Sequence, residues 1–337
     1  MHYMLCKESH WTKTLQKELI ADFSKSNQTV GELPLIKIPC DVDLKDKYIA
    51  FSTTCLPNAF EITADSISQQ TKKISENFID QIPNNIKINF HVFGLTDKYG
   101  VLETGRAEII KEKIFSVLKK KKINCQSKQF DRSCGFLQIL ILADRSMAIS
   151  FITANEMDNY RSVISPFVGG FNNVADDKHA PSRAFKKIVE AQAILGEAIL
   201  PNETLVDLGA CPGGWSYIAR KNGAHVIAID RSPLDANLMD DSKVKFIKTD
   251  AFKYKATENV DWVVSDIICA PERILELINY WVLGKNCRRF IFTIKFQGQR
   301  DYGVLKKFKK IAAECEFRVV LKQLNANKNE VTIMGAM

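Results

Sequence analysis

The sequence has few of the features that mark secreted, membrane-spanning or zinc-binding proteins. Its 337 residues include 9 cysteines, an odd number, and no two of them are spaced as C-x-x-C, so neither a disulfide framework nor a zinc ribbon is indicated. The residues before Lys7 lack the long apolar core of a signal peptide, and no uninterrupted apolar run is long enough to span a bilayer. We therefore expect an intracellular, cytoplasmic protein without a membrane anchor.

Apolar sequence and positive charge are abundant. Hydrophobic residues make up 46% of the chain, which is enough for a large core, and the length favours roughly two or three domains over one. The formal net charge of +8 favours a polyanionic partner, but charge alone does not separate RNA from DNA or from an anionic membrane. Local motifs have to identify the ligand.

A glycine-rich loop in the C-terminal half carries the strongest local pattern. A strand is predicted over 203–208 and a helix over 215–221, which ends before Gly223, where a left-handed residue is favoured. Glycines let a ligand approach the backbone, the first helical turn has free N–H groups, and Pro212 suits a first helical position. A nucleotide-like ligand is therefore expected at this loop. Its sequence is Asp207-Leu208-Gly209-Ala210-Cys211-Pro212-Gly213-Gly214-Trp215.

The spacing of this loop disfavours a dinucleotide. The dinucleotide fingerprint has a second glycine where this chain has Cys211, and the loop has no lysine. Asp207, Asp230 and Asp250 lie at the ends of successive predicted strands, where an acidic side chain can hold ribose hydroxyls. S-adenosylmethionine fits this pattern, since it has an amine, a ribose and an adenine but no phosphate. The alternative is an ordinary sheet whose strand ends are acidic because they are solvated.

Alternation of strands and helices from Pro181 onward predicts a mostly parallel, doubly wound sheet. A strand at 261–265 is followed by Asp266, and a strand at 289–294 is followed by Lys295. Since ligands bind beyond the carboxyl ends of such strands, both side chains are expected to face the site.

Two more charged residues flank this sheet. Lys187 lies off the apolar stripe of a helix that begins near Ser182, a position where lysines are ordinarily solvated. Glu330 begins the second strand of an antiparallel hairpin predicted over 317–334, and its apolar neighbours favour partial burial.

The N-terminal half has no visible catalytic motif. Strands at 35–38 and 48–52 are expected after a helix at 11–23. The following elements are expected to be a helix at 64–82, a strand at 88–93, a helix at 106–122, and strands at 136–142 and 148–152. This order is found in THUMP domains, which bind RNA, and also in many other α+β units.

The motifs of the C-terminal half occur in the order found in FtsJ-like ribose 2'-O-methyltransferases, and the chain resembles this family. The segments that carry the resemblance are Ser182-Arg183-Ala184-Phe185-Lys186-Lys187, the glycine loop, Val264-Ser265-Asp266, Ile294-Lys295 and Glu330-Val331. The approach over 171–181 and the ending Glu330-Val331-Thr332 resemble those members that modify a cytidine of large-subunit ribosomal RNA. Asn329 departs from the arginine common in the family, and Ile267-Ile268-Cys269 replaces its common Met-Ala-Pro.

The resemblance implies a Rossmann-like class I methyltransferase fold that uses S-adenosylmethionine, acts on ribosomal RNA and needs no metal. It implies a catalytic tetrad of Lys187, Asp266, Lys295 and Glu330. In it, Lys295 would deprotonate or orient the 2'-hydroxyl, Asp266 and Lys187 would fix the position of that hydroxyl, and Glu330 would tune the cluster.

The resemblance also implies a cofactor site. Asp207 would lie near the methionine amine, Asp230 at the ribose and Asp250 at the adenine amine, and Trp215 is as well suited to packing as to ligand contact. The complete set of expected cofactor-binding residues is Asp207, Gly209, Cys211, Pro212, Gly213, Gly214, Trp215, Asp230, Asp250 and Asp266.

The implied domain division has four parts. They are a ferredoxin-like segment at 1–62, a THUMP-like RNA-binding domain at 63–170, a linker at 171–181 and the catalytic domain at 182–337. Contacts with RNA phosphates are expected from Arg300 and from Lys306, Lys307, Lys309 and Lys310, with a merely solvated helix face as the alternative. Two other functions remain open: a ribose methyltransferase of the same fold acting on tRNA or the mRNA cap, and a non-catalytic RNA-binding assembly factor.

Overall fold

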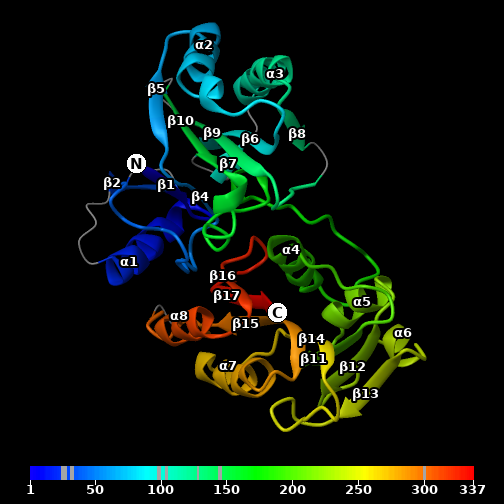
Figure 1. Cartoon of the computed structure of the whole chain (residues 1–337). Coiled ribbons are helices and arrows are strands. Elements are labelled where there is room, and N and C mark those ends of the chain that lie inside the picture. Colours follow the sequence, from blue (N-terminus) through cyan, green and yellow to red (C-terminus); the bar gives the residue numbers. More distant parts are fainter. Residues whose placement is uncertain are drawn as a thin grey trace. The chain divides into compact units, whose positions relative to one another are not determined.

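A computed structural model describes residues 1–23, 29–30, 34–96, 100–102, 105–126, 129–142, 146–298 and 301–337. These residues form two compact units, Met1–Asn172 and Asn173–Met337. Each unit has its own β-sheet core (Figure 1). Within the ranges described, no helix is both long and apolar enough to cross a membrane.

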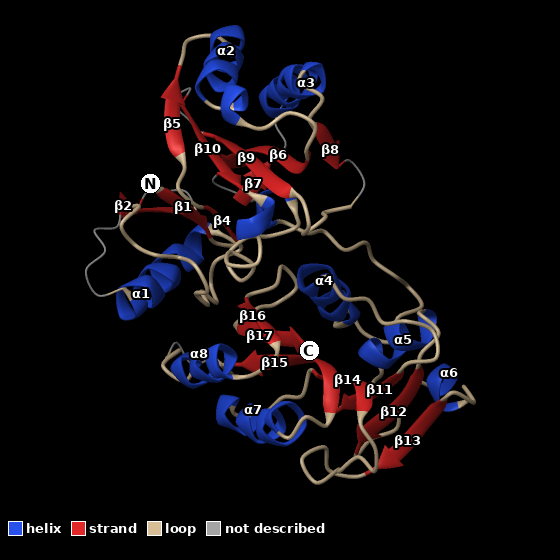
Figure 2. Cartoon of the chain, in the orientation of Figure 1, coloured by secondary structure: helices blue, strands red, loops and turns tan. Residues whose placement is uncertain are grey.

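The first unit contains two sheets (Figure 2). The four-stranded sheet, in the order β2-β3-β1-β4, consists of β1 (His2–Leu5), β2 (Thr29–Val30), β3 (Leu35–Ile38) and β4 (Thr54–Leu56), and α1 (Thr12–Asp22) follows β1. The six-stranded sheet has the path β5-β10-β9-β6-β7, with β8 beside β6. Its strands are β5 (Phe60–Thr63), β6 (Lys87–Thr96), β7 (Gly100–Leu102), β8 (Asn124–Gln126), β9 (Gly135–Ile141) and β10 (Ser146–Ile152).

The six-stranded sheet packs against other elements on both faces. Successive side chains of a strand point to opposite sides, so neighbouring residues of one strand belong to different cores. On β6, Val92 belongs to a core with residues of α2 (Ile67–Asn77) and α3 (Gly105–Lys120). The next residue, Phe93, belongs to a second core with residues of the four-stranded sheet. The apolar strands expected at 88–93, 136–142 and 148–152 are confirmed in this sheet.

The strand expected over 48–52 is wrong. The Glu18 carboxylate on α1 accepts hydrogen bonds from the backbone N–H groups of Ala50, at 2.7 Å, and Phe51, at 3.0 Å. These two N–H groups are therefore bonded to a side chain in a turn and not to a neighbouring strand. The fourth strand of the four-stranded sheet is β4. The helix expected over 64–82 is also shorter, since α2 begins after Ser66, whose hydroxyl accepts from Gln69 N at 3.2 Å.

The second unit is a seven-stranded sheet with helices on both faces (Figure 2). The strand order is β13-β12-β11-β14-β15-β17-β16, and β17 runs in the direction opposite to the other six strands. The strands are β11 (Thr204–Leu208), β12 (His225–Asp230), β13 (Val244–Lys248), β14 (Val260–Ser265), β15 (Cys287–Lys295), β16 (Arg318–Lys322) and β17 (Glu330–Ala336). One face carries α4 (Phe185–Leu195), α5 (Gly214–Lys221) and α6 (Ala236–Met239), and the other carries α7 (Pro271–Leu277) and α8 (Leu305–Glu314). The Rossmann-like α/β fold with a terminal hairpin is confirmed.

The strand order reverses between β11 and β14, which places a crevice beyond their carboxyl ends. The two strand ends are joined through a side chain: Ser265 Oγ, fully buried at the end of β14, donates to Leu208 O on β11 at 2.8 Å. The loops that follow β11, β12 and β14 therefore meet at one place.

Candidate active site

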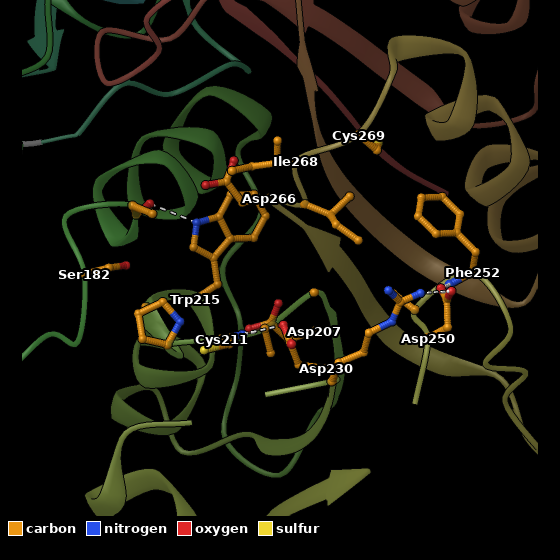
Figure 3. A pocket seen from close by; sticks show the side chains of 18 of the residues that line it. Ser182, Asp207, Cys211, Trp215, Asp230, Asp250, Phe252, Asp266, Ile268 and Cys269 are labelled. Carbon is orange, nitrogen blue, oxygen red and sulfur yellow. Dashed lines mark hydrogen bonds and ion pairs between the residues drawn. The ribbon is translucent and has the colours of Figure 1, made fainter. Parts of the chain in front are cut away.

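A cavity of about 520 Å³ occupies this crevice (Figure 3). Its volume is within the range of sites for small molecules and cofactors. The lining residues are Ser182, Ala184, Asp207, Gly209, Ala210, Cys211, Pro212, Gly214, Trp215, Asp230, Arg231, Thr249, Asp250, Ala251, Phe252, Asp266, Ile267, Ile268, Cys269, Arg273 and Lys295. They come from the carboxyl ends of five neighbouring parallel strands (β13, β12, β11, β14 and β15) and the segments that follow them, from the segment before α4 and from α7.

The glycine loop forms one wall of the cavity. Gly209 has a φ of +75°, and a Cβ at this position would lie 3.0 Å from side-chain atoms of Ile267. Gly213, also expected to bind the cofactor, is not among the lining residues; it packs against α6, where a Cβ on this residue would lie 2.3 Å from Leu238. Glycine thus lets the loop turn and pack closely against two other segments.

Pro212 does not occupy a first helical position, which corrects the sequence prediction. It follows a cis peptide bond and its carbonyl accepts a hydrogen bond from Asp235 N at 3.0 Å. The helix α5 begins two residues later at Gly214, with Gly213 as its N-cap. The loop is turned toward the segment after β12 before the helix starts.

The three strand-end acids line the same cavity, as their places in the sheet require. Asp230 accepts from Cys211 N and Ser232 N, each at 2.9 Å. Asp250 accepts from Phe252 N at 3.0 Å and also contacts the Arg231 guanidinium. These contacts fix both carboxylates, and Figure 3 shows Asp230 and Asp250 on neighbouring parts of the wall.

Asp207 is in a different electrostatic environment. It is 2% exposed, and its Oδ2 accepts from Ser216 N at 3.0 Å and Ser216 Oγ at 2.7 Å. Burial raises the pKa of this carboxyl to about 7, and the nearby Asp266 and Asp230 act in the same direction. Asp207 is therefore an acid that changes charge near neutral pH.

Lys187, Asp266, Lys295 and Glu330 meet beside this cavity. The Lys187 ammonium lies 2.9 Å from Asp266 Oδ1 and 2.7 Å from Glu330 Oε2. Lys295 Nζ lies 3.2 Å from Asp266 Oδ1 and donates to the Asp266 carbonyl at 2.6 Å. In the sheet, Lys295 on β15 is directly opposite Glu330 on β17.

The four side chains of this tetrad come from α4, the end of β14, β15 and β17, and are between 9% and 17% exposed. Asp266 and Lys295 also line the cavity, whereas Lys187 and Glu330 lie behind them. Lys187 is not solvated as its place off the apolar stripe suggests. Two carboxylates neutralise its charge, which offsets the cost of burial.

Residues 180–334 match the sequence profile of the FtsJ-like methyltransferase family. The second unit of this chain therefore contains an FtsJ-like methyltransferase domain. Curated relatives named ribosomal RNA large subunit methyltransferase M are also similar. The protein of Alkalilimnicola ehrlichii is 31% identical over 50% of this chain and 49% of its own length. The protein of Halorhodospira halophila is 35% identical over 46% of this chain and 47% of its own length. The protein of Psychromonas ingrahamii is 30% identical over 63% of this chain and 60% of its own length. The chain thus spans about half the length of the first relatives it matches.

In the FtsJ-like unit, the segment expected as a linker is held on the surface of α5. Asp177 accepts from Tyr217 Oη at 2.9 Å and pairs with Lys221 at 2.8 Å. The contact with Lys221 holds the pKa of Asp177 at about 2. Trp215 Nε1 donates to Ala184 O at 2.8 Å, so the indole both lines the cavity and fixes the start of α4.

Several residues of the FtsJ-like site were not predicted. Arg231, Thr249, Phe252 and Arg273 line the cavity, and the Arg273 guanidinium carbon lies 3.6 Å from the centre of the Phe252 ring. Phe252 follows Asp250 by two residues, and this closeness to an expected site residue was the only feature of the sequence that pointed to Phe252. Arg273 lies on α7, and only the packing of α7 beside the cavity identifies it.

Two further features of the FtsJ-like unit bear on its chemistry. Desolvation, and secondarily Asp230, raises the pKa of the Cys211 thiol, which disfavours the nucleophilic thiolate. Lys306, Lys307 and Lys310 are exposed on α8, as both a phosphate-binding face and a solvated face require. Arg300 lies outside the described residues.

Proposed function

We propose that the FtsJ-like unit transfers the methyl group of S-adenosylmethionine to a ribose 2'-hydroxyl of RNA. The observation that carries this proposal is the meeting of two lysines and two acids beside a cavity lined by three strand-end aspartates. The match of residues 180–334 to the FtsJ-like family supports the same reaction class.

The cavity residues fit S-adenosylmethionine. Asp207, Asp230 and Asp250 offer carboxylate oxygens to the amine, the ribose hydroxyls and the adenine amine, and each carboxylate can accept more hydrogen bonds than the structure already gives it. A Cβ at Gly209 would crowd Ile267, so glycine keeps this wall close and smooth. The lysine-free loop does not favour a phosphate group. When bound, this cofactor supplies an activated methyl group.

The tetrad would serve the hydroxyl that receives this methyl. Lys295 borders the cavity and would contact the 2'-hydroxyl, while Asp266 and Lys187 hold Lys295 in place through a chain of contacts of 2.9 and 3.2 Å. Methylation of the hydroxyl oxygen would release the hydroxyl proton, and Lys295 is the side chain placed to orient that hydroxyl or to accept its proton. Glu330 contacts Lys187 and would hold its ammonium group in position. Alignment of the reacting groups is the larger part of this catalysis.

We further propose large-subunit ribosomal RNA as the substrate, with a cytidine as the modified nucleotide. The names of the curated relatives and the net charge of +8 support this substrate. The first unit would bind the RNA through a THUMP-like domain at 63–170, behind a ferredoxin-like segment at 1–62. Mapping ribose methylation in cells with and without the gene tests the substrate, and a missing methyl in tRNA or in an mRNA cap would contradict it.

The catalytic proposal is tested with Lys295→Ala. We expect the rate of methyl transfer to RNA to fall about 10²-fold or more, because the group beside the hydroxyl is lost. The affinity for S-adenosylmethionine, measured by calorimetry, should stay within about threefold, since that cofactor is expected to bind mainly through other residues.

Lys285→Ala is a suitable control, since Lys285 is an exposed lysine that pairs with Glu316 just before β15. This control should transfer methyl groups at the unmodified rate. Unchanged turnover in Lys295→Ala would remove the proposed role of the tetrad.

A further inference from the structure

A buried carboxylate outside the tetrad fastens the loop that leads to Glu330. Glu190 lies on α4, one turn after Lys187, and is 1% exposed. It accepts hydrogen bonds from Asn325 N and Asn325 Nδ2, each at 2.8 Å, and from Ala326 N at 3.3 Å. An ionised carboxylate is costly to bury, and such donors are what offset the cost.

The loop at 323–329 joins β16 to β17, and Asn327 connects it to Glu330. Asn327 is fully buried, and its Nδ2 donates to Glu330 Oε2 at 3.2 Å. Its Oδ1 accepts from Leu324 N at 2.8 Å and from Thr332 Oγ1 at 3.2 Å. A backbone N–H can only donate, so the contact with Leu324 fixes which end of the amide faces Glu330.

The helix α4 is thus attached to the terminal hairpin at two points. Lys187 contacts Glu330 itself, and Glu190 contacts the loop whose Asn327 contacts the same Glu330 oxygen. Residues three apart on a helix lie on the same side, which allows both contacts at once.

We propose that Glu190 is a positioning residue for the tetrad: it sets where the 323–329 loop, and through Asn327 the Glu330 carboxylate, lies relative to Lys187. This inference deepens the proposed methyl transfer and rests on it. Glu190 is not among the residues that line the cavity, so it acts through Glu330 and Lys187 and not by touching a ligand.

The test is Glu190→Gln, which keeps the size of the side chain but turns one acceptor oxygen into a donor. The new NH₂ group of the glutamine cannot accept a hydrogen bond from the N–H groups of Asn325 or Ala326, so the loop must shift. We expect kcat for methyl transfer to fall about 30-fold, because small displacements of catalytic groups have large effects on rate. The Kd for S-adenosylmethionine should change less than about threefold.

The matched control is Glu203→Gln at the opposite edge of the same sheet. Glu203 also accepts several hydrogen bonds, from Leu200 N and Trp262 Nε1, each at 2.9 Å, and it pairs with Arg289. Its replacement should lower the melting temperature without lowering kcat. A purely structural role for Glu190 predicts instead that both variants lose activity only in proportion to their loss of folded protein.

A milder variant keeps the test open if Glu190→Gln does not fold. Asn325→Ala removes the side-chain donor and leaves the two backbone donors, so kcat should fall about 3- to 10-fold. Hydrogen exchange supplies a readout that needs no activity: the amides of Asn325 and Ala326 should exchange faster in Glu190→Gln and at the unmodified rate in Glu203→Gln.

The two proposals fail in distinguishable ways. If the unmodified protein binds S-adenosylmethionine but methylates no RNA, the proposed function fails, and the exchange measurement alone decides whether Glu190 holds the loop. If the unmodified protein is active and Glu190→Gln keeps its kcat, or loses no more than Glu203→Gln, the positioning role is wrong.

Discussion

Each end of the strands in the seven-stranded sheet carries a cluster of two acids and two cationic side chains, and the cations differ between the two clusters. At the carboxyl edge, Lys187 and Lys295 pair with Asp266 and Glu330. The cluster at the amino edge consists of Arg289, Arg318, Glu197 and Glu203. There, Arg289 contacts Glu197 at 3.1 Å and Glu203 at 2.9 Å, and Arg318 contacts Glu197 at 2.9 Å.

The difference follows from what each cation can do. The guanidinium group of arginine is planar and permanently charged, and it binds two acids at fixed angles, which suits the joining of strands. A lysine ammonium is a compact charge that can lose its proton, which suits chemistry. Only the lysine cluster borders the cavity at the carboxyl ends of the strands. We therefore propose that the arginine cluster holds the strands together and that the lysine cluster acts on the ligand.

The strongest way to break this comparison is Lys295→Arg. Arginine stays permanently charged beside Asp266 and cannot accept the hydroxyl proton, so methyl transfer should fall about 10³-fold. The measurement is single-turnover transfer of labelled methyl groups to RNA at saturating cofactor. A variant that retains a tenth or more of the rate would show that charge alone suffices at this edge.

A second prediction compares the two ends of β11. Glu203, just before the strand, has Arg289 as its cation, whereas among the described residues Asp207 has no cation within ion-pair distance. Its pKa is raised from 3.8 to about 7, so the folded protein holds this proton more tightly than the unfolded chain does. The resulting stability is complete below about pH 4, declines as the pH rises, and is lost above about pH 7.

Asp207→Asn removes this dependence. Relative to the variant, the unmodified protein should lose about 4 kcal/mol of unfolding free energy between pH 4 and pH 7. Urea unfolding of both proteins at several pH values measures the difference. Parallel stability curves across this range would mean that the carboxyl is solvated in the folded protein.

The smallest expected effect is that of Arg289→Lys at the amino edge. Lysine keeps the charge but cannot contact both acids with one planar group, so we expect the free energy of unfolding to fall by about 1 kcal/mol. Methyl transfer should be unchanged, in contrast to the reverse exchange at Lys295. Loss of activity without loss of stability would contradict the division of roles between the edges.

Local patterns predicted much of the second unit. The apolar runs around β11, β12 and β14 were identified because buried parallel strands need continuous apolar sequence. A strand was predicted at 48–52 but does not form, because the Glu18 carboxylate on α1 accepts hydrogen bonds from the backbone N–H groups of Ala50 and Phe51. No window around residue 50 contains that information.

The candidate site shows the same division. The sequence by itself determined the glycine loop, the acids at strand ends and, through family resemblance, the four residues of the tetrad, because each is a short motif with a fixed local spacing. Only the tertiary structure decided that Lys187 is buried between two acids, that Asp207 titrates near neutral pH and that Glu190 fastens the loop before Glu330. These properties depend on desolvation and on contacts across many residues, from α4 to β17. They arise when separate elements are packed together.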